Sequence, residues 1–483
     1  MSAPTKYPDT QLFIAGTWRA GAAGRAIDVL NPATNERIGG VACAEIADLD
    51  EALAAAHKGF AVWRATSAFE RGKILRRAAD FLRQRHEHVA TIMTTEQGKP
   101  IAEARMEVMA SADLLDWFAE EGRRAYGRLV PARAAGIQQM VIREPVGPVA
   151  AFTPWNFPIS QAARKLGTAL AAGCPVILKA AEDTPATAAE LVRALADAGV
   201  PDGVVNLVFG TPAQISEYLV PHPVIRKISF TGSVPVGKHL AALAGQHMKR
   251  ATMELGGHGP AMVFDDCDIE AASALLAGAK YRNAGQVCVS PTRFLIQDKV
   301  MDAFVDRFVK NARALKVGDG LDPETRMGPL VNERRRQAVE ELIADARQKG
   351  AVVATGGNRI GNTGNFLEPT VLTGVTSQMR IMNEEPFGPV ALVMGFHDLD
   401  EAVAEANRLP FGLAAYAFAR SAKTVAALAE RVETGMLSVN HLGLALPETP
   451  FGGVKDSGYG SEGGSEALEP YFSPKFVSHA TQA

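Results

Sequence analysis

The stretch VGPVAAFTPWNFPISQAARKLGTALAAGCPVILK, residues 146–179, decides the fold of this chain. Its first part, Val146–Phe152, is a short apolar run that predicts a buried strand. A helical pattern follows over Ser160–Ala172 and ends at Gly173, a residue typical of helix C-termini. A second apolar run, Pro175–Lys179, predicts another buried strand. Strand, helix and strand in this order predict a parallel βαβ unit.

The same rhythm continues downstream. We expect a helix that Thr184-Pro185 caps and opens and that runs to Ala198, strands at Val204–Val208 and Ile225–Phe230, and a helix from Pro235. Such alternation is typical of an α/β fold with a doubly wound, Rossmann-like parallel sheet, which binds ligands beyond the carboxyl ends of its strands. The segments at those ends are Trp155-Asn156, Lys179–Glu182, Gly210 and Thr231-Gly232-Ser233.

The flanking regions carry further elements. Upstream, helices are predicted over Leu49–Trp63, Phe69–Met93 and Ile101–Glu121, with Asp48 and Ser67 as caps of the first two. Downstream of Glu254 a second alternating region has helices at Ile269–Tyr281, Met301–Ala314, Leu399–Asn407 and Ala422–Val432, and strands near Arg293–Ile296, Val352–Thr355 and Val390–Phe396. Arg128–Arg143 predicts two strands around a turn, and Phe472–Ala480 predicts one more.

Bulk composition excludes several function classes. A chain of 483 residues exceeds what one hydrophobic core supports, so two or more domains are expected. The net charge of −3 argues against nucleic acid or an anionic membrane as the main partner. The apolar stretch 145–163 contains four prolines and is no membrane span, and the N-terminus lacks an apolar leader. Cys43, Cys174, Cys267 and Cys288 form no CxxC or zinc pattern, which predicts no metal and a reduced, cytoplasmic chain.

Two short motifs supply the parts of a covalent mechanism. Cys288 ends the segment RNAGQVC, and Glu254 stands in MELGG, thirty-four residues earlier. A thiol can act as a nucleophile, and a carboxylate can activate water as a general base. Either motif alone is weak, since a lone cysteine is usually a small buried hydrophobe.

Six motifs in one order make a specific pattern that resembles the aldehyde dehydrogenase superfamily. They are TPWNFP (153–158), LK with Glu182 and Thr184-Pro185, FTGS (230–233), the Glu254 and Cys288 motifs taken together as one, EPFGP (385–389) and PFGGVK (450–455). The resemblance implies that Cys288 attacks an aldehyde carbon, that Asn156 and the Cys288 N–H hold the oxyanion, and that Glu254 activates the water that hydrolyses the thioester. It predicts NAD as the preferred cofactor, with NADP possible.

The same resemblance assigns cofactor residues. Lys179 and Glu182 would bind the adenosine ribose, and a carboxylate at Glu182 would repel the 2′-phosphate of NADP. Glu385 would hold the nicotinamide ribose, with Phe387 beside it. The full set expected around the cofactor is Trp155, Lys179, Glu182, Gly210, Gly232, Ser233, Leu255, Glu385 and Phe387.

A phosphate-binding loop is the remote alternative. Residues 232–238, GSVPVGK, fit the first seven positions of a GxxxxGK loop after a strand, which would imply a nucleotide hydrolase. The eighth position is His239, so the hydroxyl that would bind Mg²⁺ is missing, and Pro235 removes a backbone N–H from the loop.

Two arginines bear on the substrate. Arg164 follows the Asn156 loop and Arg282 precedes Cys288 by six residues. The succinate-semialdehyde dehydrogenase branch has arginines at both positions that grip the remote carboxylate, and a guanidinium fork suits that group. Either arginine could instead form a structural ion pair.

The chain departs from that branch in two places. The loop His441–Glu448 has no hydroxyl, so the tail end of the pocket is more apolar or His441 takes a polar role; Phe451 is expected in the same pocket. Ser290 stands where some relatives have a second cysteine, so no disulfide switch can form. Succinate semialdehyde is the leading substrate, while glutarate semialdehyde, a ketoglutarate semialdehyde and a sulfolactaldehyde stay open.

The resemblance also implies a division of the chain. Residues 1–122 and 146–254 would form the NAD-binding domain, 255–446 the catalytic domain, and 123–145 with 470–483 the oligomerisation strands. Exposed strand edges in the last group are a liability in a monomer, so a homodimer or homotetramer is expected.

Overall fold

The first of two large sheets is an eight-stranded sheet of order β2-β1-β9-β8-β7-β10-β11-β21. The structure is a computed structural model that describes residues 7–480, so residues 1–6 and 481–483 of the expected domain ranges lie outside the described residues. The five parallel strands of this sheet are β7 (Val149–Phe152), β8 (Val176–Lys179), β9 (Val205–Val208), β10 (Lys227–Gly232) and β11 (Arg250–Leu255). β1 (Leu12–Ile14), β2 (Thr17–Arg19) and β21 (Gly458–Tyr459) extend it in antiparallel pairing.

Strand order in this sheet creates the ligand crevice. From β7 the chain runs outward through β8 to β9, then returns to place β10 on the other side of β7. The connections after β7 and β10 therefore diverge, and a crevice opens at the carboxyl ends of these two strands. The Asn156 loop follows β7 and Thr231-Gly232 ends β10, so both predicted segments reach this crevice.

Eight α-helices cover this sheet. They are α1 (Ile46–Ala65), α2 (Ala68–Gln84), α3 (His86–Gln97), α4 (Ile101–Glu121), α5 (Pro158–Ala172), α6 (Pro185–Asp197), α7 (Pro212–Leu219) and α8 (Val234–Gln246). The prediction of one helix over Phe69–Met93 was wrong, because the chain kinks at Arg85 and turns α3 onto α4 and α6.

Of the predicted helix caps, Asp48 was wrong, Ser67 is confirmed, and Thr184 holds the N-cap position of α6 without its hydroxyl bonding a helix N–H. Glu45 caps α1, while Asp48 occupies the third helical position, where its carboxylate accepts the Glu45 N–H at 2.7 Å. The Thr184 hydroxyl caps nothing; Glu96 instead accepts the first free N–H groups of α6. Ser67 caps α2 as predicted, at 3.2 Å from the Glu70 N–H.

The second large sheet has seven strands in the order β14-β15-β16-β13-β12-β18-β19. Its strands are β12 (Gly259–Val263), β13 (Pro291–Gln297), β14 (Val352–Thr355), β15 (Thr370–Thr373), β16 (Val390–Phe396), β18 (Ala414–Phe418) and β19 (Met436–Val439). Its helices are α9 (Ile269–Tyr281), α10 (Met301–Arg313), α11 (Glu333–Gln348), α12 (Leu399–Asn407) and α13 (Ala422–Arg431). All pairs are parallel except β14 with β15, which confirms the α/β fold.

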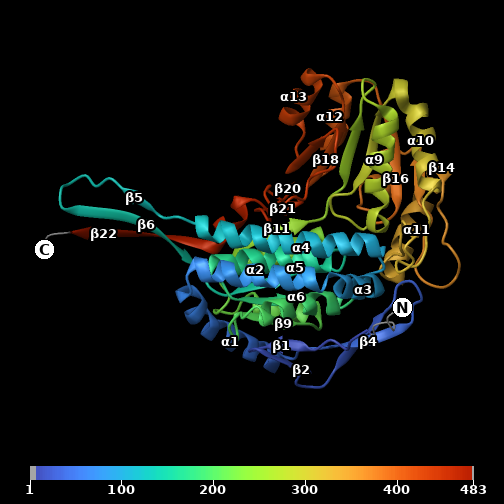
Figure 1. The fold of residues 1–483 in the computed structure, drawn as a ribbon. Helices are drawn as coiled ribbons and strands as arrows, with labels where there is room; N and C mark the ends of the chain where they lie inside the picture. Colours follow the sequence, from blue (N-terminus) through green and yellow to red (C-terminus); the bar gives the residue numbers. More distant parts are fainter. Residues whose placement is uncertain (1–6, 481–483) are drawn as a thin grey trace.

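Helix α11 is the main element that sequence reasoning did not predict. Half of its sixteen residues are charged, and its buried apolar residues are Val339, Leu342, Ile343 and Ala346. These positions have the helical spacing i, i+3, i+4 and i+7, so the sequence contained a helix signal that was overlooked. Figure 1 shows α11 where the two large sheets meet.

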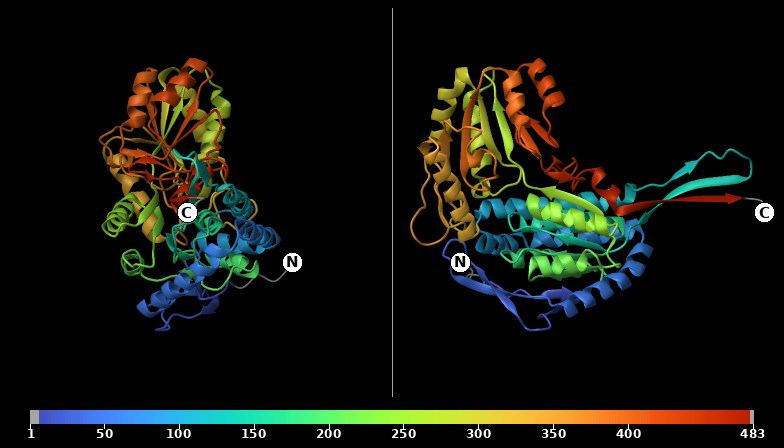
Figure 2. Two further views of the ribbon diagram at one scale, coloured as in Figure 1. Left: turned by 90° about the vertical axis from the view of Figure 1, so that its left-hand side faces the viewer. Right: turned by 180° about the vertical axis from the view of Figure 1, so that it is seen from behind.

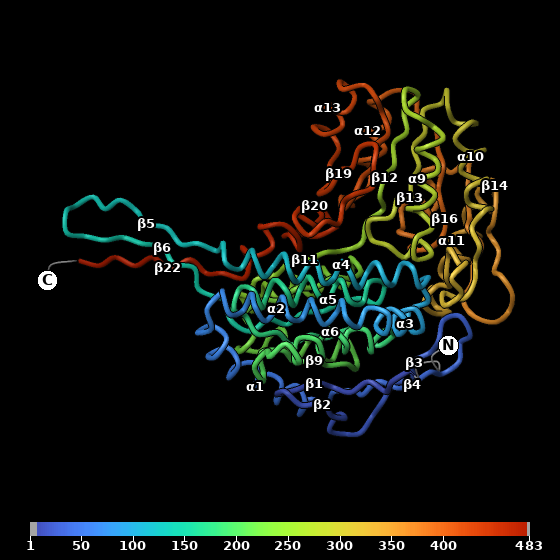
Figure 3. Tube along the Cα trace, in the orientation of Figure 1, coloured from blue at the N-terminus to red at the C-terminus, as the bar shows by residue number. Residues whose placement is uncertain are grey.

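The chain crosses between the two sheets at Gly256-Gly257-His258, directly after Glu254 at the end of β11. A Cβ on Gly256 would lie 2.5 Å from the Glu385 carboxylate, so only glycine allows this approach. The tube in Figure 3 follows this passage from β11 into the upper sheet. Glu254 therefore stands at the boundary of the two sheets.

A three-stranded sheet projects from the molecule (Figures 1 and 2). β22 (Phe472–Ala480) pairs along β6 (Ile137–Pro145), and β5 (Arg128–Val130) pairs with the other edge of β6. The strands predicted at Arg128–Arg143 and Phe472–Ala480 are confirmed. Smaller pairs are β3 (Ala26–Leu30) with β4 (Arg37–Ala42) and β17 (Phe411–Gly412) with β20 (Val454–Lys455). Within residues 7–480, no helix is long and apolar enough to cross a membrane.

Candidate functional site

Cys288 lies in a conformationally restricted loop before β13. Asn283 and Ala284 adopt left-handed backbone angles, with φ of 48° and 52°, and Gly285 follows at 73°. A Cβ on Gly285 would lie 2.0 Å from the Gly388 carbonyl oxygen. The Gln286 side chain accepts the Val331 N–H at 2.9 Å. These contacts fix the position of the thiol.

The Glu254 carboxylate and the Cys288 thiol lie close enough for the charge of Glu254 to act on the thiol. Burial, with the nearby Glu462 charge, raises the pKa of Glu254 to about 7. Burial, with the charges of Glu254 and Glu385, raises the pKa of the Cys288 thiol well above its usual value. The pair therefore holds a protonated thiol beside a carboxyl group that titrates near neutral pH, where a general base is effective.

Asn156 lies beside this pair. Its side-chain N–H donates to the Gln286 carbonyl at 3.1 Å, two residues before Cys288, and its side-chain oxygen has no partner. Its backbone carbonyl accepts from Lys99 Nζ at 2.8 Å and from the Asn283 amide at 2.9 Å. Lys99 also forms a buried ion pair with Glu107. The loop after β7 is thereby joined to the loop before β13.

A second buried network lies behind Glu254. Lys165 pairs with Glu462 and donates to Ser229 Oγ at 3.0 Å. Gln161 Nε2 is 3.5 Å from Glu254 Oε2. Sequence reasoning missed Lys99, Lys165 and Glu462; Lys165 had a usable signal, because it and Arg164 are the only charges in an otherwise apolar α5.

The predicted adenosine residues lie together. Lys179 Nζ is 2.7 Å from one Glu182 oxygen, and the Gly210 N–H donates to the other at 2.9 Å. Ser233 precedes α8 but caps no N–H there, and Leu255 fills the space above Gly237. The ammonium of Lys238 pairs with Asp456 at 2.6 Å.

The predicted nicotinamide residues form a second group. The Trp155 and Phe387 rings meet edge to face with centroids 5.6 Å apart. Glu385 accepts the Gly257 N–H at 3.3 Å, and burial raises its pKa to about 8. These residues join the ends of β7, β11 and the segment before β16.

The two arginines differ in their surroundings. Arg164 is 5% exposed, donates to the carbonyls of Glu462 and Ala445, both at 3.1 Å, and lies 4.5 Å from the centre of the Phe451 ring. Arg282 is exposed and lies 5.0 Å from the centre of the Phe157 ring. Its guanidinium donates to no other residue among those that the structure describes.

Tyr416 and His441 complete this side of the site. The Tyr416 hydroxyl donates to the Val289 carbonyl at 2.6 Å, and the charges of Cys288 and Arg282 both act on its pKa, which burial raises. Sequence reasoning missed it. His441 is exposed, and its ring accepts the Gly443 N–H at 3.1 Å within its own loop.

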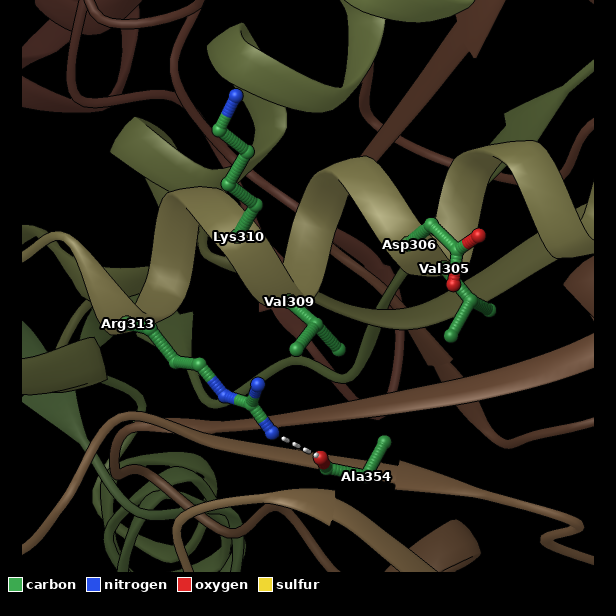
Figure 4. A pocket seen from close by; sticks show the side chains of 6 residues that line it. All are labelled: Val305, Asp306, Val309, Lys310, Arg313 and Ala354. Carbon is green, nitrogen blue, oxygen red and sulfur yellow. Dashed lines mark hydrogen bonds between the residues drawn. The ribbon is translucent and has the colours of Figure 1, made fainter.

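Outside this site, the described residues 7–480 also form an open surface hollow. The open hollow of about 520 Å³ in Figure 4 lies on α10, and none of the predicted site residues line it. Its Arg313 donates to the Ala354 carbonyl at 3.2 Å. Among the described residues, no cluster of His, Cys, Asp and Glu could hold a metal ion.

The raised pKa of the Cys288 thiol should be visible in the pH dependence of its alkylation. Because the Glu254 charge opposes ionisation of Cys288, Glu254→Gln should shift the alkylation curve to lower pH. The measurement is iodoacetamide incorporation by intact mass over a pH series, with Cys288→Ala as the control for the other three cysteines. Identical alkylation curves for wild type and Glu254→Gln would show that the charge of Glu254 does not act on the Cys288 thiol.

Comparisons with known proteins agree with this site. The profile of the aldehyde dehydrogenase family matches residues 18–477. The chain is 48% identical to 4-(hydroxymethyl)benzenesulfonate dehydrogenase TsaD1 of Comamonas testosteroni, covering 98% of each protein. It is 41% identical to succinate-semialdehyde dehydrogenase [NADP(+)] GabD of Escherichia coli K12, over 98% of this chain and 99% of that protein. The crystal structure of succinate-semialdehyde dehydrogenase from Burkholderia pseudomallei superposes with a TM-score of 0.96 at 43% identity, covering 99% of each chain. The chain, whose thiol and buried carboxylate lie where its two α/β sheets meet, therefore belongs to the aldehyde dehydrogenase family.

Proposed function

We propose that this chain oxidises a short aldehyde with an anionic tail, with succinate semialdehyde as the leading candidate. One observation carries the proposal: Arg164 and Arg282 both lie on the Cys288 side of the site. The charge of Cys288 acts on Arg164, and Arg282 and Cys288 both act on Tyr416. Two guanidinium groups near one nucleophile favour a substrate whose other end is a carboxylate or sulfonate.

The chemistry follows from the contacts around Cys288. The Cys288 thiol loses its proton to solvent, and the thiolate attacks the aldehyde carbon. The second side-chain N–H of Asn156 and the Cys288 backbone N–H stabilise the oxyanion. A bound nicotinamide dinucleotide supplies the hydride acceptor for the oxidation. What remains on Cys288 is a thioester, which water attacks while Glu254 takes its proton; the acid and the free thiol result.

The residues present fit such a cofactor. Lys179, Glu182 and Gly210 support an adenosine ribose at the ends of β8 and β9. Glu385 supports the second ribose, with Trp155 and Phe387 packed at the ring end. Under this proposal residues 7–122 and 146–254 serve the cofactor, and 255–446 carry the nucleophile.

A second candidate is a bulkier, aromatic aldehyde with a sulfonate. Leu444 and Phe451 belong to the apolar cluster that Cys288 and Leu442 pack against. The loop 441–448 offers no hydroxyl to a carboxylate. An apolar wall suits an aromatic ring, and the relative from Comamonas is named for a benzenesulfonate. Aldehydes of both classes, together with glutarate semialdehyde, ketoglutarate semialdehyde and sulfolactaldehyde, belong in the substrate panel.

Cys288→Ala should abolish aldehyde oxidation and leave cofactor binding intact. Glu254→Gln should give one turnover of reduced cofactor and then stall at the thioester. Since the pKa of Glu254 is raised from 4.5 to about 7 and only its charged form is a base, wild-type kcat should rise with pH through about 7. Burst and steady-state absorbance at 340 nm measure both effects. Full steady-state turnover in either variant would exclude the mechanism.

NAD should be preferred to NADP, because the Glu182 carboxylate faces the ribose. Glu182→Ser removes that charge and frees Lys179 to pair with a 2′-phosphate. We expect the kcat/KM ratio of the two cofactors to shift toward NADP by about tenfold, which corresponds to ~1.4 kcal/mol. A wild-type enzyme that prefers NADP would show that Glu182 does not bind the ribose.

Arg282→Ala should lower kcat/KM for an anionic aldehyde by about ten- to a hundredfold, the value of a charge-assisted hydrogen bond. A neutral aldehyde of equal length should lose little, and Arg282→Lys should recover part of the rate. Arg164→Ala should reduce both rates and stability, because Arg164 also holds two backbone carbonyls. If Arg282→Ala lowered kcat/KM equally for charged and neutral aldehydes, an acid-tailed substrate would be excluded.

We also propose that the projecting sheet joins subunits into a dimer or tetramer. Leu129 is 81% exposed and Phe476 60% exposed on its strands, and an exposed strand edge invites pairing. Light scattering should give a mass that is a multiple of 51.3 kDa. A monomer at micromolar concentration would contradict the proposal.

A further inference from the structure

Helix α11 crosses the gap between the two ends of the proposed cofactor site. Asn332, Arg335 and Val339 are three, then four residues apart and so share one helix face. Asn332 Nδ2 donates to Asp183 at 3.1 Å, beside Glu182. At the other end, a Cβ on Gly388 would lie 2.6 Å from a Val339 methyl, beside Phe387.

Arg335 therefore lies between the two groups. It is half-buried, its Nε is shielded from water without a partner, and its guanidinium donates to no residue that the structure describes. Burial lowers its pKa, while Glu385 is close enough for the two charges to act on each other. A shielded donor without an acceptor is costly, so this arrangement favours an anionic ligand at Arg335.

The order of groups in a dinucleotide identifies the anion. Its diphosphate joins the two riboses, and the two ribose-binding carboxylates proposed above are Glu182 and Glu385. A cation between those carboxylates would meet the diphosphate. The other expected phosphate site, the first turn of α8, contains Pro235 and offers fewer N–H groups.

We infer that Arg335 binds the diphosphate of the dinucleotide cofactor, reaching it from a helix of the second sheet whose N-cap residue, Asn332, contacts Asp183 of the first domain. The guanidinium fork can donate two parallel hydrogen bonds to phosphate oxygens, and the N-terminus of α11 adds a partial positive charge. The inference rests on the proposed cofactor-dependent function. It adds a phosphate-binding residue that no motif in the sequence marks.

Direct binding tests the inference without turnover. ADP-ribose and NAD are titrated by calorimetry into wild type, Arg335→Gln, Arg335→Lys and Arg334→Gln. Arg334 is the matched control, since it is the adjacent, exposed arginine on the same turn. Adenosine, which lacks phosphate, is titrated by ligand-observed NMR.

Arg335→Gln should weaken ADP-ribose binding by about ten- to a hundredfold and reduce its salt dependence, whereas adenosine affinity should stay unchanged. Arg335→Lys should recover part of the loss, and Arg334→Gln should match wild type. Unchanged ADP-ribose affinity in Arg335→Gln would overturn the inference. Equal losses for adenosine and ADP-ribose would overturn it too, since Arg335 would then only brace the groove against Glu385. Wild type that binds neither ADP-ribose nor NAD would instead overturn the proposed function.

Discussion

The backbone carbonyl of Asn156 accepts two hydrogen bonds on which the rest of the site depends. One comes from Lys99, at the start of α4, and one from Asn283, in the loop that carries Cys288. Glu107 completes the unit, because it pairs with Lys99 and accepts N–H groups at the start of α5. Charged partners in a buried site hold position strongly, since breaking one leaves an uncompensated charge. Nucleophile and oxyanion donor thus keep a fixed separation although they belong to different sheets.

Much of this arrangement could be predicted from the sequence. The βαβ rhythm after Pro145 predicted the first sheet, and the segments that follow β7 and end β10 reach the crevice between these two strands. Glu254 and Cys288 lie close enough for the charge of Glu254 to raise the pKa of the thiol, as their motifs suggested. These features follow from apolar periodicity and from short motifs, both of which are local.

The remaining features depend on contacts between distant residues. Lys99 meets Asn156 across fifty-seven positions, and Lys165 meets Glu462 across almost three hundred. Arg164 was expected to face the substrate, but two backbone carbonyls take part of its hydrogen-bonding capacity, and neither carbonyl marks the sequence. Helix α11 is a different case, because its apolar residues at i, i+3, i+4 and i+7 are a local signal that sequence reasoning missed. Contacts between charged residues that are far apart in the sequence produce no periodic pattern, so the sequence alone does not predict them.

The loops around Cys288 differ in how tightly they are held. The segment 282–288 has three residues at positive φ and glycine contacts that leave no space for a side chain. The segment 441–448 is largely exposed, with Leu446 at 51%, and the hydrogen bonds that hold it are made mostly by its backbone carbonyls, as at Ala445 and His441. Substitutions in the first would disturb the nucleophile, whereas those in the second would mostly reshape the mouth of the pocket. Natural drift and laboratory evolution toward new aldehydes should therefore collect changes in 441–448 and leave the chemistry untouched.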